Sequence, residues 1–186
     1  VSPKFSLGVN NEFRYKSFHF SFLVDWKNGG QMYSGINRLM NLYGTSAVTG
    51  DRATASMVIK GVKASTVDAD GKGGQANDIA VTGANNFQEL YSGVYGNISE
   101  ANIYSTSFVK LRDVSLSFDL PKSVCEKTKF ISSASLSVSA RNILLWTALP
   151  NADPESSQGN GNMQGGFDYM SLPQTRSMGV GLNLTF

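Results

Sequence analysis

The sequence contains very little cysteine, histidine or charge. Among its 186 residues there is one cysteine, Cys125, and one histidine, His19. A single cysteine excludes an internal disulfide and a cysteine-based metal cluster, and a single histidine excludes a histidine cluster around a metal. Charged residues make up 16% of the chain, and the net charge of +2 comes from scattered basic residues. This distribution argues against a nucleic-acid partner.

Long apolar runs are also missing from the sequence. No stretch approaches the ~20 consecutive apolar residues of a membrane-spanning helix. The 19 glycines, with many serines and asparagines, favour β-structure joined by turns over a helical bundle. The sequence opens at Val1-Ser2-Pro3, almost directly in a strand pattern and without a signal-peptide pattern. We interpret it as a piece of a longer, exported chain.

The last ten residues show the clearest pattern in the chain. Apolar side chains alternate there with Ser, Gly, Asn or Thr, which is the period of a strand with two unlike faces. The polar face carries no charge. A strand of about ten residues with an apolar outer face and a small polar inner face is typical of a transmembrane β-barrel. The pattern predicts a lipid-facing row on a barrel-closing strand: Met178, Val180, Leu182, Leu184 and Phe186.

Four further segments have a strand pattern, so the predicted fold class is all-β. The strongest segment puts most of its large side chains on one face: Phe18, Phe20, Phe22, Val24 and Trp26. A change of parity near Arg112-Asp113 predicts a β-bulge, or else a change of surroundings where the strand leaves the membrane. The predicted strands cover residues 4–13, 17–28, 105–120, 134–147 and 176–186, and the two long outer loops cover residues 29–104 and 148–175.

Short and long connections alternate along these five predicted antiparallel strands, as they do in outer-membrane barrels. The pattern places the short connections and the C-terminus in the periplasm and the long loops outside the cell. Five strands are too few to close a barrel, since the smallest bacterial ones use about eight. We therefore expect residues 1–186 to be the C-terminal part of a larger barrel in the bacterial outer membrane.

Several segments resemble the SusC/RagA-type TonB-dependent outer-membrane transporters of Bacteroidetes. The most specific segment is Ser107-Phe108-Val109-Lys110-Leu111-Arg112-Asp113-Val114-Ser115-Leu116-Ser117-Phe118-Asp119-Leu120-Pro121. The similarity continues through Ser139-Ala140-Arg141-Asn142-Ile143-Leu144-Leu145-Trp146-Thr147, Asp153-Pro154-Glu155, and Leu172-Pro173-Gln174-Thr175-Arg176-Ser177 to Phe186. Upstream, Tyr43-Gly44-Thr45, Asp51-Arg52, Gly61-Val62, Asp70-Gly71 and Asn77 resemble the family's large outer loop.

The resemblance implies a β-barrel of about 22 strands, closed inside by a plug domain, of which this chain supplies the last five strands. It implies an importer of oligosaccharides or peptides that works with a SusD-like surface lipoprotein and draws energy from the TonB complex through an N-terminal region. Its other partners are the remainder of the barrel and plug, outer-membrane lipid, and the cargo.

The sequence offers no catalytic constellation, so we expect neither an enzyme nor a cofactor. Asp153 and Glu155 are interpreted as residues of a flexible loop, and Asp68-Ala69-Asp70-Gly71 as a solvated turn because its glycine falls too early for an EF-hand. Aromatic side chains in the two long loops are candidates for contact with cargo or with the SusD-like lipoprotein: Tyr33, Phe87, Tyr91, Phe167 and Tyr169. For each of them, packing against a neighbouring loop is the alternative.

Two other functions remain open from the residues. A soluble or surface-exposed β-sandwich that binds a partner also explains alternation with one packed face. A passive porin-like channel without energy coupling fits the same strands. A sandwich accepts charge freely on its wet face and needs no detergent.

Overall fold

The computed structural model describes residues 2–51, 53–128, 130–156 and 166–186. The chain divides into two compact units, one formed by Val1–Tyr33 with Tyr104–Phe186 and the other by Ser34–Ile103.

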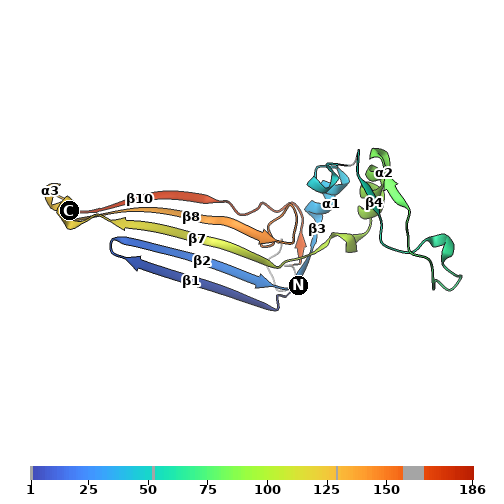
Figure 1. Cartoon of the computed structure of the whole chain (residues 1–186), viewed down its shortest axis with the longest axis horizontal. Coiled ribbons are helices and arrows are strands. Elements are labelled where there is room, and N and C mark those ends of the chain that lie inside the picture. Colours follow the sequence, from blue (N-terminus) through green and yellow to red (C-terminus); the bar gives the residue numbers. More distant parts are fainter. Residues whose placement is uncertain (1, 52, 129, 157–165) are drawn as a thin grey trace. The chain divides into compact units, whose positions relative to one another are not determined.

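The first unit is built on a five-stranded sheet in the order β1-β2-β7-β8-β10 (Figure 1). All neighbouring strands are antiparallel. This confirms the predicted antiparallel β-structure. The strands are β1 (Phe5–Tyr15), β2 (Phe18–Asn28), β7 (Phe108–Asp119), β8 (Ser133–Thr147) and β10 (Ser177–Thr185). β1 and β10 each have one neighbour in this sheet, so within the described residues the sheet has two unpaired outer edges.

The register of the strands gathers the apolar residues on one face of the sheet. One row crosses all five strands: Phe13, Phe20, Leu116, Val138 and Val180. This face is open, since Val138 is 50% and Val180 75% exposed. Among the described residues, none of the buried apolar side chains lies on β1, β2 or β10. The described chain therefore leaves a broad apolar face without cover.

At one end of the sheet, short connections join β1 to β2 and β7 to β8. The long connections leave from the other end (Figure 1). The β1–β2 turn has two residues, Lys16 and Ser17, with Lys16 at φ 52°. It is shorter than the predicted connection of residues 14–16, because Arg14 and Tyr15 stay paired with His19 and Phe18. Between β7 and β8 the chain forms α3 (Lys122–Thr128) directly after Pro121, a residue that suits a helix start.

A β-bulge interrupts the middle of β7 and confirms the one predicted near Arg112-Asp113. Leu23 and Val24 of β2 pair with Asp113 and Leu111, so Arg112 is the additional residue on β7. Toward β8 the register shifts at the same level, and Asn142 there has φ 52°. The shift changes which residues of β7 face the apolar side, from Val109 and Leu111 to Val114 and Leu116.

Segments of the two long connections pair to form a small sheet in the order β6-β3-β9. Its strands are β6 (Ile103–Ser105), β3 (Gln31–Ser34) and β9 (Phe167–Asp168). The amide of Tyr33 donates to the carbonyl of Gly166 at 2.8 Å, and that of Thr106 to Gly30 at 3.1 Å. Met32, in β3, is 1% exposed.

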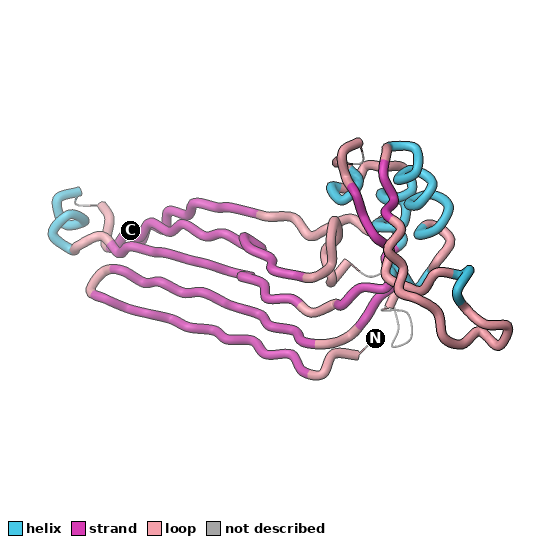
Figure 2. The backbone as a smooth tube through the Cα atoms, turned by 45° about the vertical axis from the view of Figure 1, so that its right-hand side comes forward, coloured by secondary structure: helices cyan, strands magenta, loops and turns pink. Residues whose placement is uncertain are grey.

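The second unit has short helices and strands where the sequence shows almost no pattern (Figure 2). A short helix, α1 (Gly35–Leu42), is capped by Ser34. The other elements are η1 (Ala47–Thr49), β4 (Ser56–Val58), η2 (Ala64–Thr66), β5 (Ala80–Thr82), α2 (Ala84–Glu89), η3 (Leu90–Tyr95) and η4 (Ser99–Asn102). β4 pairs with β5, and Phe87 and Leu90 are buried. The segment is thus a compact unit rather than an irregular loop.

Candidate functional site

The polar face of the five-stranded sheet carries a hydrogen-bonded cluster around the single histidine. Arg14 Nε donates to His19 Nδ1 at 2.9 Å, and His19 Nε2 lies 2.8 Å from Asp119 Oδ2. Because Nδ1 accepts, this arrangement puts the ring proton on Nε2, which donates to Asp119. The cluster lines a polar cavity of about 270 Å³ together with Glu12 and Ser21. His19 thus lies on the polar face, as strand alternation predicts.

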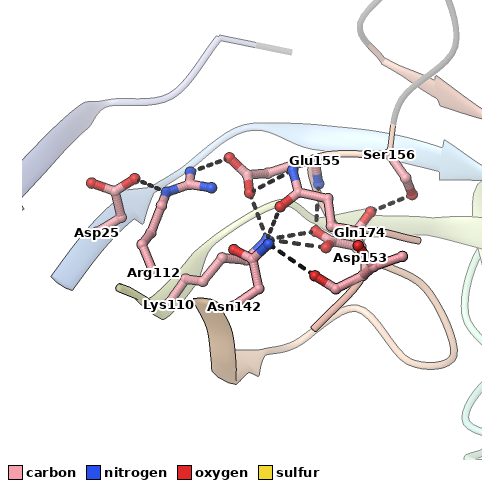
Figure 3. Close-up of polar contacts among 9 residues, drawn as sticks. Asp25, Lys110, Arg112, Asn142, Asp153, Glu155, Ser156 and Gln174 are labelled. Atoms are coloured by element: carbon pink, nitrogen blue, oxygen red, sulfur yellow. Dashed lines mark hydrogen bonds and ion pairs between the residues drawn. The ribbon is translucent and has the colours of Figure 1, made fainter. Parts of the chain in front are cut away.

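A second cluster on this face is centred on Lys110 of β7, which is 1% exposed. Its ammonium Nζ lies 3.0 Å from Asp153 Oδ2, 2.6 Å from Glu155 Oε2 and 3.3 Å from Gln174 Oε1 (Figure 3). A buried ammonium is costly unless it is paired and hydrogen-bonded. The contacts with Asp153, Glu155 and Gln174 meet that requirement.

Arg112 extends the Lys110 cluster to the next strand. Its Nη2 donates to Glu155 Oε1 at 2.5 Å, and its Nε donates to Asp25 Oδ2 on β2 (Figure 3). Bulges often redirect a side chain, and Arg112 is the additional residue of the β7 bulge. We call Asp25, Lys110, Arg112, Asp153, Glu155 and Gln174 the ion network. It holds residues 153–155 and 174 against the polar face of the sheet at β2 and β7.

The ion network corrects the interpretation of Asp153 and Glu155 as residues of a flexible, solvated loop. Asp153 is 7% exposed, and both carboxylates are held by cations from β7. Sequence reasoning missed Lys110 and Arg112 as their partners. One signal was present: two cations two residues apart on a strand, and two carboxylates two residues apart in the loop.

The charges around Glu155 control its titration. Partial burial alone raises the pKa of Glu155, but hydrogen bonds from Arg112 and Lys110, with their positive charges, outweigh burial and lower the pKa below the usual 4.5. A carboxylate with a lowered pKa in the folded state contributes stability above its unfolded pKa. That contribution is lost as the pH falls through the folded-state pKa.

We expect this loss to appear when the natural sequence is compared with a Glu155→Gln variant. The difference between their denaturant midpoints should be constant near neutral pH and should disappear in acid, below pH 4.5. Glu126→Gln, at an exposed position on α3, is the matched control. A Glu155→Gln variant whose stability follows that of the natural sequence at every pH would contradict a role for this carboxylate.

Three of the predicted loop aromatics come together in one stack. The rings of Tyr33 and Phe167 lie 5.4 Å apart between centroids and are nearly parallel, at 6°. Phe167 and Tyr169 follow at 6.0 Å and 12°. Phe167 is 42% and Tyr169 44% exposed. We call Tyr33, Phe167 and Tyr169 the aromatic stack; it joins segments about 135 residues apart and presents ring surface to solvent.

The other two predicted aromatics lie in the second unit and differ from each other. Phe87 is 3% exposed, so its side chain is not open to cargo and the packing alternative holds for it. Tyr91 is part-buried and packs between Phe87 and Tyr95, with ring centroids 6.4 Å and 5.8 Å away. The Tyr91 hydroxyl lies 3.5 Å from the carbonyl of Val48.

Asp68 caps its own turn. Its Oδ1 accepts from the amides of Asp70 and Lys72 at 3.2 Å and 2.6 Å. Across the described residues, no group of three or more histidine, cysteine or carboxylate side chains is arranged to hold a metal ion. In the same part of the chain, no helix has the length and apolar character needed to cross a membrane.

Three curated proteins of Formosa agariphila are similar to this chain over nearly all of its length. TonB-dependent receptor P3 is 30% identical over 190 residues, which cover 100% of this chain and 16% of that protein. TonB-dependent receptors P39 and P26 are 25% and 26% identical, covering 98% and 99% of this chain and 16% and 17% of theirs. The chain thus spans less than a fifth of the length of these relatives. No family profile matches it.

Solved structures share its fold. The RagAB peptide importer in its open-open state matches with a TM-score of 0.63 and 17% identity, over 100% of this chain and 17% of that one. The closed-closed state matches with a TM-score of 0.58 and 19% identity, over 97% and 16%. Together these matches confirm the resemblance seen in the sequence: over nearly its full length the chain is similar to one segment of TonB-dependent receptors, and it shares the fold of a segment of the RagAB peptide importer.

Proposed function

We propose that this chain forms part of the barrel wall of a TonB-dependent importer in the bacterial outer membrane. The remainder of the barrel and a plug complete the protein, a SusD-like lipoprotein covers its outer face, and the TonB complex supplies energy. The cargo is an oligosaccharide or a peptide. The observation that carries the proposal is the continuous, uncovered apolar face of the five-stranded sheet.

The dimensions of the sheet suit a lipid bilayer. β1 and β2 have 11 residues each, which corresponds to about 37 Å at ~3.4 Å per residue. Tilted by ~45°, such a strand covers about 26 Å, close to the ~25 Å apolar band of outer-membrane barrels. On this basis Met178, Val180, Leu182, Leu184 and Phe186 face lipid.

The two faces of the sheet argue for a barrel rather than a sandwich. Soluble monomers rarely expose contiguous apolar patches of more than a few hundred Å². Here the apolar face extends over five strands, and the opposite face holds the His19 cluster and the ion network. A polar interior and an apolar exterior are the arrangement of a transmembrane barrel.

The connections suggest the orientation. The short ones, including α3, belong at the periplasmic side, and the loops that carry the aromatic stack belong outside the cell. Exposed rings there can stack on sugar rings or contact apolar side chains of a peptide. Import as the general activity is supported by the names of the relatives, which are receptors and a peptide importer.

Fractionation and uptake assays on the full-length receptor test this proposal. We expect the receptor in the outer-membrane fraction, with a gel mobility that changes on boiling. Uptake of labelled oligosaccharides or peptides by intact cells should require the receptor and stop when a protonophore removes the energy source. A receptor found only in the soluble fraction would support the sandwich, and uptake that persists with the protonophore would support a passive channel.

A further inference from the structure

The second unit contains a cavity of about 230 Å³ that lies wholly within Ser34–Ile103. It lies at the C-terminal end of α1, beside α2 and the start of η3. None of the described residues that line it carries a charge. The polar and aromatic ones are Asn41, Tyr43, Thr49, Asn85, Gln88 and Tyr91.

The lining combines amides with aromatic rings. Asn85 and Gln88 lie on α2 and are exposed, so their amide groups can reach a ligand. Asn41 adds a buried Oδ1 that has no hydrogen-bond partner within the described residues. Because neighbouring atoms cover that oxygen, a ligand reaches it only if they move, so the exposed amides of Asn85 and Gln88 are the groups open to a ligand.

The rings differ in how firmly they are held. Tyr91 is fixed by its neighbours Phe87 and Tyr95 and by the contact of its hydroxyl with Val48. Tyr43 is 74% exposed. A fixed ring and an open ring beside neutral amides offer both apolar surface and hydrogen-bonding groups to one ligand.

We propose that this cavity binds one unit of a neutral, polyhydroxylated chain, that is, of an uncharged oligosaccharide. Each sugar hydroxyl both donates and accepts, as do the amides of asparagine and glutamine, and the ring of a sugar has an apolar face that suits tyrosine. The proposal rests on the proposed function and narrows its cargo class.

Size and charge support this choice. The cavity is smaller than the ~300–1,000 Å³ of sites that enclose a drug-sized ligand, so it suits a single ring of a longer chain. An acidic sugar or the charged end of a peptide would find no opposite charge among the described lining residues. Uncompensated charge is costly to desolvate, which selects for neutral ligands.

The test is calorimetric binding to the full-length receptor in detergent. The probes are maltohexaose, xylohexaose and laminarihexaose as neutral saccharides, an oligogalacturonate of the same length as the acidic one, and hexa-alanine as the peptide. The variant Asn85→Ala/Gln88→Ala removes two exposed amides of the cavity. The control is Gln75→Ala, an exposed amide of the same unit that does not line the cavity.

We expect at least one neutral saccharide to bind and the double variant to weaken its binding about tenfold or more, as for the loss of two neutral hydrogen bonds. Gln75→Ala should bind as the natural sequence does. The proposal is overturned if no neutral saccharide binds at ~1 mM, if the double variant binds unchanged, or if hexa-alanine or oligogalacturonate is the ligand that the double variant loses.

Binding and import can fail separately. A receptor that binds the saccharide at this cavity but does not import it would contradict the proposed function and leave the binding site standing. A receptor that imports cargo in an energy-dependent way, with the double variant unchanged in binding, would contradict the binding site and leave the proposed function standing.

Discussion

Leu182→Arg is expected to destabilise the full-length receptor by ~2–4 kcal/mol, the cost of a cation on the lipid face near the middle of a bilayer. Leu182 lies on the apolar face of β10, opposite Leu136 of β8, and is 61% exposed in this chain. The arginine would have to leave water for hydrocarbon, with no acidic partner in its row. The measurement is the denaturant midpoint of the receptor in lipid vesicles, together with the fraction inserted.

Asn183→Arg is the matched control, because it places the same cation one residue away on the opposite face of β10. We expect it to cost much less than Leu182→Arg. Equal losses in the two variants, or insertion of Leu182→Arg with unchanged stability, would show that the face assignment is wrong.

Lys110→Met is expected to cost about 3–5 kcal/mol, the usual penalty when one partner of a buried ion pair is removed. Methionine keeps much of the side-chain volume but leaves the buried Asp153, and Glu155 beside it, without the ammonium. The loss should appear as a lower denaturant midpoint and as faster proteolysis in residues 153–155, which the network holds against β2 and β7.

Two comparisons isolate the buried ion pair. Arg141→Met removes a cation from an exposed pair with Asp113, whose arginine side chain is 73% exposed; we expect a cost of ~0–1 kcal/mol. Adding Asp153→Asn to Lys110→Met removes the stranded charge and should recover part of the loss. A Lys110→Met variant as stable as Arg141→Met would contradict the importance of the network.

The sheet could be predicted because its strands are long and their alternation is regular. The row from Phe18 to Trp26 repeats over five positions, and the final strand repeats over five more. Even the bulge was visible, because an additional residue at Arg112 reverses the parity of everything beyond it. Side-chain alternation is a local property, so one sequence is enough to show it.

The second unit could not be predicted in the same way. Its strands have three residues each and α2 has six, which is too short for a period to repeat. The ion network was missed for a different reason. Lys110 and Asp153 are 43 residues apart, and no local pattern shows that a loop folds back onto a strand.

The loop aromatics show what residue type and loop position can predict and what they cannot. All five were chosen by residue type and loop position alone. Tyr33, Phe167 and Tyr169 share a stack because β3 and β9 belong to the same small sheet, whereas Phe87 is in the core of the second unit. Composition identified residues able to contact a cargo, but burial distinguishes Phe87 from the others.

The unpaired edges of β1 and β10 bear on how the chain can be produced. Within the described residues neither outer edge has a strand neighbour, so its amide and carbonyl groups can hydrogen-bond to an extended segment. In water, copies of this chain alone are expected to join edge to edge and to stack through their apolar faces, giving ribbons and precipitate. If the chain is part of a barrel, as proposed, neighbouring strands would cap both edges, and we expect the nascent segment to need a holdase until they do.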